Sequence, residues 1–180
     1  FTSERYEVIV VTDNANAVYE GAGDSAAETN NRSVDDQQIS VSVLPRPDLQ
    51  VFSVTGPDTV DAGATMSVSY QIINQGPVAT TVPFWTDRVY LSLDDKITYD
   101  DILVSSQGNA SALANGERYT APTEVTFKVP ERFRGNVYVI VQTDAGNAVS
   151  EWPNEGNNVK LFPVYVNPWP FADLVVHDVK

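Results

Sequence analysis

The sequence predicts an all-β fold, a seven-stranded sandwich of the immunoglobulin or fibronectin type III kind that occurs in a tandem repeat. Apolar and polar residues alternate with a period of two along much of the chain, whereas helical periodicity is hard to find. Clusters of Gly, Pro, Asn and Asp separate these segments, which is typical of short strands joined by turns. A near-copy of Val137–Asn158 (VYVIVQTDAGNAVSEWPNEGNN) stands at Tyr6–Asn31 (YEVIVVTDNANAVYEGAGDSAAETNN), so one structural unit is expected at least twice.

The composition is that of an acidic chain that can build a packed core. Of its 180 residues, 42% are hydrophobic, and the net charge is −13. This charge disfavours a nucleic acid or an anionic membrane as a partner. The chain has no cysteine, which excludes disulfides, zinc–thiolate sites and a thiol nucleophile. No apolar run has the length of a membrane span, so we expect no direct membrane insertion, and a signal or anchor would lie outside this sequence.

The first 43 residues are predicted to be the last strands of a preceding unit. Strands are expected at Tyr6–Thr12 and Arg32–Val43, on either side of an acidic turn. Val43–Asp48 (VLPRPD) follows as a stiff two-proline junction. Because a fold rarely begins with its last two strands, we expect the sequence to be a window of a longer repetitive protein.

A complete unit is expected from residue 44 to residue 167. Its seven strands are predicted at Leu49–Val54, Met66–Ile72, Pro83–Leu93, Ile102–Ser105, Tyr119–Val129, Val137–Val141 and Val159–Val166. The inward face of the third strand is predicted to carry Trp85, Asp87, Val89, Leu91 and Leu93. Pro122 makes the first part of the fifth strand an edge or a bulge. Residues 168–180 are expected to begin a third unit, because Ala172–Val179 (ADLVVHDV) matches Pro47–Val54 (PDLQVFSV).

Several segments of this unit carry a resemblance to a known family. They are ADLVV and PDLQV at the first strand, YQIINQG in the second, WTDRVYLS in the third, DDKITYDDILV after it, and VIVQTDAGNAVSEWPNEGNN at the end. Together they resemble the CARDB domain, a cell-adhesion-related repeat of bacterial and archaeal surface proteins. The resemblance implies an immunoglobulin-like fold in a secreted or surface-displayed multidomain protein without catalysis of its own. It implies no single ligand, because the family decorates many kinds of protein.

Catalytic motifs are absent from the sequence. The single histidine, His177, lies beside Asp178 in the truncated last strand, and neither a nucleophile elbow nor a phosphate loop is present. The chain is therefore not expected to be an enzyme.

Acids and amides gather in the last turn of the repeat and predict a Ca²⁺ site. In this sandwich the loop between strands two and three and the loop between strands six and seven share one pole, so Asp87 is expected to approach Asp144. Oxygen ligands without His or Cys favour Ca²⁺ over Mg²⁺. In the alternative, Asp144 and Asn147 bond only turn amides, while Asn157 and Asn158 cap the last strand. The predicted ligands are Asp87, Asp144, Asn147, Glu151, Glu155 and Asn158, with Asp13, Asn16, Glu20 and Glu28 in the first copy.

A second acidic cluster, Asp94, Asp95, Asp100 and Asp101, lies between the third and fourth strands. Its spacing is not that of an EF-hand loop. We favour a solvated hairpin, because Asp is common in turns. The alternative is a Ca²⁺ joint shared with the neighbouring unit of a stacked array.

The three tryptophans are expected to differ in role. Trp85 is predicted to lie in the core and Trp169 to pack at a junction. Trp152, at the apex of the last loop, is the one candidate for stacking on a sugar.

These features together predict a structural role outside the cell or at its surface. The chain is expected to be a rigid repeat module that spaces or presents other parts of a surface protein, adhesin or fibre. The alternative is a module that binds carbohydrate or protein, appended to a secreted enzyme. The expected partners are neighbouring repeats, or other subunits joined head to tail in a filament by strand addition, and also glycans or surface proteins.

Overall fold

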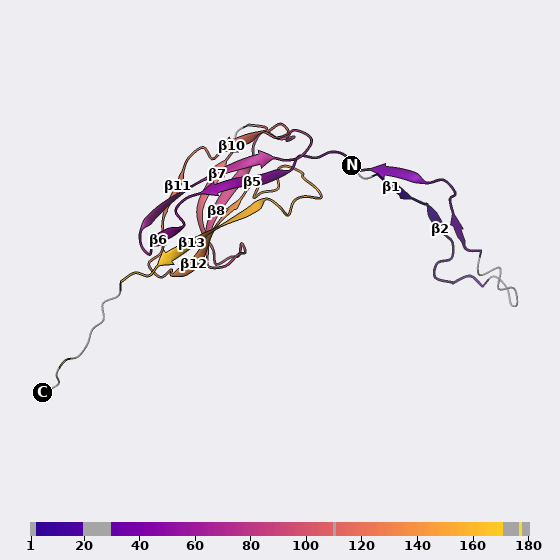
Figure 1. The fold of residues 1–180 in the computed structure, drawn as a ribbon. Coiled ribbons are helices and arrows are strands. Elements are labelled where there is room, and N and C mark those ends of the chain that lie inside the picture. Colours follow the sequence, from indigo (N-terminus) through magenta and orange to yellow (C-terminus); the bar gives the residue numbers. More distant parts are fainter. Residues whose placement is uncertain (1–2, 20–29, 110, 171–176, 178–180) are drawn as a thin grey trace. The chain divides into compact units, whose positions relative to one another are not determined.

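The computed structural model describes residues 3–19, 30–109, 111–170 and 177, and every regular element in these ranges is a β-strand. The chain divides into an N-terminal unit, Phe1–Pro45, and a C-terminal unit, Arg46–Lys180 (Figure 1). No helix that could cross a membrane occurs in the described ranges. The all-β class predicted from the period-two alternation is confirmed.

The N-terminal unit is a two-stranded ribbon with two interrupted strands. Its antiparallel pairs are β1 (Ser3–Tyr6) with β4 (Ile39–Ser42), and β2 (Ile9–Val11) with β3 (Arg32–Val34). Each of the two predicted strands is thus divided. The first is interrupted at Glu7 and Val8. The second is interrupted at Asp35, whose carboxylate accepts a hydrogen bond from Gln37 N at 3.0 Å and makes a local turn.

One sheet of the C-terminal unit is built around the long strand β7 (Thr65–Asn74). β5 (Leu49–Thr55) pairs with one side of it, and β10 (Arg118–Thr120) and β11 (Val125–Lys128) pair with the other, all antiparallel. β10 and β11 are the two parts of the predicted fifth strand. The interruption includes Pro122, which lacks the amide that a ladder requires.

The second sheet has five strands in the order β6-β13-β12-β8-β9. They are β6 (Thr59–Asp61), β13 (Val159–Asn167), β12 (Gly135–Gln142), β8 (Thr86–Ser92) and β9 (Ile102–Gly108). All neighbours are antiparallel except β6 and β13, which are parallel. The unit therefore has nine strands where seven are predicted, because β6 is added and the fifth strand is split.

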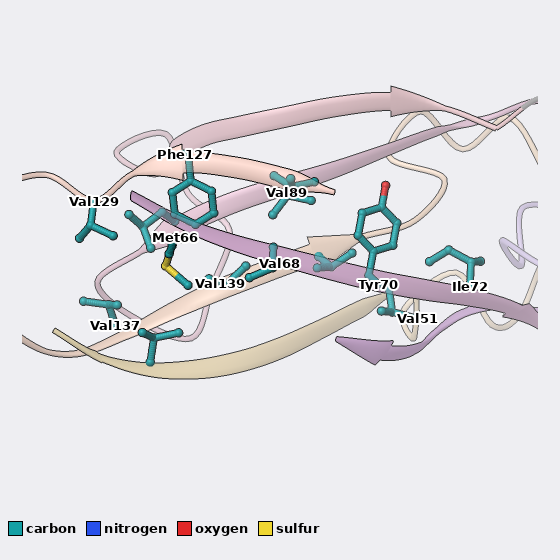
Figure 2. Close-up of a cluster of buried hydrophobic side chains, with 14 of the residues drawn as sticks. Val51, Met66, Val68, Tyr70, Ile72, Val89, Phe127, Val129, Val137 and Val139 are labelled. Atoms are coloured by element: carbon teal, nitrogen blue, oxygen red, sulfur yellow. The ribbon is translucent and has the colours of Figure 1, made fainter. Parts of the chain in front are cut away.

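The two sheets pack face to face over one apolar core (Figure 2). Alternate residues of β7 and β12 are inward and nearly inaccessible, which accounts for the period of two in the sequence. Trp85 is 3% exposed and lies in this core, as predicted. Leu93 is 61% exposed, so its predicted inward position is wrong, because β8 ends at Ser92.

Candidate functional site

The loop after β12 begins with a tight turn organised by one carboxylate. Asp144 and Asn147 both have positive φ, at 43° and 49°. The two carboxylate oxygens of Asp144 accept hydrogen bonds from Ala148 N at 2.8 Å and Val149 N at 2.9 Å. This arrangement is the turn-amide alternative of the sequence analysis, and it commits both Asp144 oxygens to backbone donors.

The N-terminal unit repeats this turn in detail. Asp13 has φ 43° and Asn16 φ 51°, and Asp13 accepts from Ala17 N at 2.7 Å and Val18 N at 2.9 Å. The two loops are also closed by the same bond, from Thr12 N to Asn31 O and from Thr143 N to Asn158 O, each at 2.9 Å. The predicted ligands Glu20 and Glu28 lie outside the described residues.

The beginning of β5 is held by side chains from distant parts of the unit. Asp48 N donates to Asn74 Oδ1 at 3.0 Å, and Leu49 N donates to Glu151 Oε1 at 2.8 Å. Asp48 also accepts from Gln75 N at 2.7 Å and, through its carboxylate, from Asn157 Nδ2 at 2.9 Å. We call these four hydrogen bonds the N-terminal clamp, because together they fix the chain where it enters the sandwich.

Asn74 is the centre of the clamp and is completely buried. Its Oδ1 also accepts from Gly76 N at 3.0 Å, and its Nδ2 donates to Val78 O at 2.8 Å and Leu113 O at 3.0 Å. Gly76 lies directly under the incoming chain, where a Cβ would come within 2.4 Å of Arg46 O. The NQG segment (residues 74–76) is thus needed where the entering chain passes over it.

Beside the clamp, three buried oxygens accept no hydrogen bond from the described residues. They are Glu151 Oε2, Glu155 Oε2 and Asn158 Oδ1, and we call these three residues the acid–amide cluster. Glu151 is fully buried, and the other carboxylate oxygen of Glu155 accepts from Glu151 N at 2.8 Å. Burial raises the pKa of Glu151 to about 7; the Leu49 amide and the nearby Asn158 side chain offset part of this rise. The cluster can therefore take up a proton or a cation.

Asp87 belongs to a separate network inside the sandwich. It is 1% exposed, and its carboxylate accepts from Thr143 Oγ1 at 2.8 Å and from the Tyr119 hydroxyl. The Tyr119 hydroxyl in turn accepts from Trp85 Nε1 at 3.2 Å. Burial raises the pKa of Asp87 to about 6, although these hydrogen bonds lower it. Both oxygens are thus occupied by protein donors.

The structure brings together only part of the predicted Ca²⁺ ligand set. Asp87 does lie beside the final loop, since Ala145 N donates to the neighbouring Thr86 O at 2.8 Å. Among the described residues, however, no three His, Cys, Asp or Glu side chains are grouped so that they could hold a metal ion. The expected convergence of four carboxylates is therefore not seen there, because backbone amides and hydroxyl groups take up Asp144 and Asp87.

Comparison with known proteins identifies the family. The CARDB family model matches residues 46–161, which is more than half of the chain. The chain belongs to the CARDB family. This is the family predicted from the motifs, and it makes the C-terminal unit an adhesion-related module of a non-catalytic kind.

Several solved structures are similar to this chain. The solution structure of the CARDB domain of a Pyrococcus furiosus protein is 26% identical with a TM-score of 0.50, covering 68% of this chain and 97% of that domain. A crystal structure of the same domain, in complex with di-metal ions, is 27% identical with a TM-score of 0.49, covering 69% and 97%. A β-glucosidase from Listeria innocua is 21% identical with a TM-score of 0.40, covering 75% of this chain but 17% of the enzyme. No curated protein matches the chain.

The second acidic cluster of the CARDB unit forms a hairpin between β8 and β9. Asp94 accepts from Lys96 N at 2.9 Å, and Asp101 accepts from Thr98 N at 2.7 Å. Asp100 accepts from Thr98 Oγ1 at 2.5 Å, which holds the pKa of Asp100 below its usual range. Asp95 is exposed. These contacts are those of the solvated hairpin favoured in the sequence analysis.

The remaining singled-out side chains of the CARDB unit lie at its surface. Trp152 is 63% exposed at the apex of the final loop. Trp169 lies against Gly63, where an added Cβ would meet its ring at 2.8 Å, which agrees with the predicted packing role. His177 is exposed.

Proposed function

We propose that this chain is a non-catalytic structural repeat of a secreted or surface-displayed protein, in which each CARDB unit spaces or presents other parts of an adhesin or fibre. The observation that carries the proposal is the N-terminal clamp. Four hydrogen bonds from Asn74, Gln75, Glu151 and Asn157 fix the two residues at which the chain enters the unit. A fixed point of attachment is what a rigid spacer needs, whereas a flexible connection would serve a freely moving module.

The tandem arrangement is supported by the N-terminal ribbon. Its residues Tyr6 and Ile39 are paired in the same register as Val137 and Val164 of the C-terminal unit. In that unit the corresponding side chains face the core, while Tyr6 and Ile39 are each 51% exposed. We infer that residues 1–43 are the last hairpin of a similar sandwich, and that residues 168–180 begin another. Neighbouring repeats, or subunits joined head to tail by strand addition, are the partners that this arrangement implies.

Ca²⁺ is the ion that we propose for the acid–amide cluster. Glu151, Glu155 and Asn158 supply three oxygens without a hydrogen-bond donor among the described residues, and two of the three residues are acidic. A buried carboxylate oxygen without a donor is costly unless a proton or a cation compensates it. The absence of nitrogen and sulfur ligands favours Ca²⁺, with backbone carbonyls or water completing its coordination. An ion bound there would stabilise the charged form of Glu151, whose other oxygen accepts the hydrogen bond from Leu49 N.

Thermal melts in Ca²⁺ and in a chelator test this site. The wild-type chain is expected to melt at a higher temperature in millimolar Ca²⁺, because a ligand bound only by the folded state adds about 2.7 kcal/mol at a hundredfold excess over Kd. Glu151→Gln keeps an acceptor for Leu49 N but removes the charge, so its melts should coincide in the two media. Glu124→Gln, at an exposed position, is the matched control and should respond as wild type does. Coincident wild-type melting curves in the two media would rule out the Ca²⁺ site but would not affect the proposed spacer function.

Trp152 supports a second candidate function, a carbohydrate-binding module. Its ring is 63% exposed at a loop apex, where a sugar can stack on it. If this is the function, the chain binds a subset of a glycan array, and Trp152→Ala abolishes that binding without changing the melting temperature. Trp169→Ala serves as the control for the loss of an exposed indole. A pure spacer binds no glycan with or without Trp152.

A further inference from the structure

The two ends of the C-terminal unit lie at opposite poles of the sandwich. The chain enters at Leu49, the first residue of β5, which Glu151 of the final loop contacts. β13 starts directly after that loop and leads away from it for nine residues, about 30 Å at ~3.3 Å per residue. Its end lies near β6 (Figure 1). Tension on the two ends of the unit is therefore directed along the strands.

β6 connects the first part of the unit to its last strand. It follows β5 along the chain and pairs with β13, and this is the only parallel pair in the described sheets. The pair aligns Thr59 with Tyr165 and Asp61 with Asn167, at the end of β13. The ladder is extended at both ends, by Tyr165 N to Asp58 O at 2.8 Å and by Ala62 N to Asn167 O at 2.9 Å. A side-chain bond from Asn167 Nδ2 to Asp61 Oδ1, at 2.8 Å, adds to it.

We propose that the β6–β13 pair is a force-bearing shear clamp, which lets the unit resist tension applied through its two ends. Pulling the ends apart drives β6 and β13 in opposite directions along their common axis. All the hydrogen bonds of a parallel pair are then loaded at the same time. A pair that is pulled open from one end, in contrast, loses its hydrogen bonds one after another, and each needs little force. This inference extends the proposed spacer function by assigning the resistance to one pair of strands.

The N-terminal clamp completes the force path. Tension reaches Asp48 and Leu49 first, and their bonds to Asn74 and Glu151 keep β5 from being peeled away before β6 is loaded. Trp169 packs on Gly63 just beyond the pair, so the leaving chain is also attached near the end of β6. Force applied at Leu49 is therefore shared between these bonds and the chain that leads through β5 to β6 and β13.

Single-molecule stretching of the full chain between terminal handles tests the clamp. Val60→Pro removes a backbone amide from β6, and Val125→Pro removes one from β11, an edge strand of the other sheet, where Val125 pairs with Val68. Both variants should melt at a lower temperature than wild type, but the unfolding force of Val60→Pro should be several-fold lower than that of Val125→Pro. Asn167→Ala, which removes only the side-chain bond to Asp61, should lower the force slightly and leave the melting temperature nearly unchanged. Equal unfolding forces for the two proline variants would overturn the proposal.

A change in pulling direction gives a test that needs no destabilising variant. Tyr99 is fully exposed in the hairpin after β8, near the pole where β13 ends, and the chain has no cysteine of its own. A handle attached through Tyr99→Cys, with the other at the C-terminus, peels β13 from its end. The unfolding force should then be several-fold lower than between the two termini. Similar unfolding forces in both directions would contradict the shear clamp. They would not contradict the spacer function, which depends on the rigidity of the chain in solution.

Discussion

Replacing Asn74 by alanine is expected to destabilise the C-terminal unit by about 3 to 5 kcal/mol. The change removes four hydrogen bonds and leaves two amides, Asp48 N and Gly76 N, and two carbonyls, Val78 O and Leu113 O, without this partner. Each such loss costs ~1 kcal/mol or more when the group is buried. Denaturant unfolding followed by tryptophan fluorescence measures the effect.

The matched control is Asn136→Ala, because Asn136 is an exposed residue of β12. It should change the free energy of unfolding by less than ~0.5 kcal/mol. Asn74→Asp is informative as well, since aspartate can accept from Asp48 N and Gly76 N but cannot donate to the two carbonyls. Its stability should lie between those of wild type and Asn74→Ala. An Asn74→Ala variant as stable as Asn136→Ala would contradict the central place given to Asn74.

The unit is expected to lose stability as the pH rises from about 4 to about 7 in a chelator. Asp87 and Glu151 have pKa values raised to about 6 and about 7 in the folded state. Between the pKa of an unfolded carboxyl, about 4, and these raised values, the folded chain binds more protons than the unfolded chain, so the free energy of unfolding falls with pH. The loss should be on the order of 2 kcal/mol for each group.

Two neutral variants separate the contributions to this profile. Asp87→Asn should remove the fall between about pH 4 and pH 6, and Glu151→Gln the fall that continues to about pH 7. Ca²⁺ should suppress only the part that Glu151 causes, because Asp87 lies in the separate network with Thr143 and Tyr119. Urea unfolding at a series of pH values provides the measurement. A flat or rising wild-type profile in the chelator would contradict the assignment of raised pKa values.

The strands of the sandwich were predictable where one face is buried. Along most of β7, and at Val137, Val139 and Val141 of β12, every second side chain enters the core. Asp87, Val89 and Leu91 of β8 follow the same rule. β6 was missed for a physical reason. It has three residues inside a segment rich in turn formers, and its parallel partner β13 lies about a hundred residues away, so its existence depends on a contact that no local pattern shows.

The site was predictable in composition but not in arrangement. Glu151, Glu155 and Asn158 were among the expected ligands, whereas the use of Asp144 by Ala148 N and Val149 N could only be offered as an alternative. Asn74 was missed as a functional residue. Its signal was present, since an Asn two residues before a Gly at a strand end often bonds to the following backbone. Its contact with Asp48, from the other strand, is not local and leaves no such mark.

The bond between Leu49 and Glu151 also determines when a unit can finish folding. Its two residues are 102 positions apart, so the first strand cannot be fixed in place until nearly the whole unit is available. Closing a loop of that length is slow compared with forming the hairpins inside it. During synthesis, the C-terminal unit would therefore remain incomplete until its final loop has emerged, and its first strand would be fixed only then. The point at which the chain enters the sandwich is therefore also among the last parts of the unit to form.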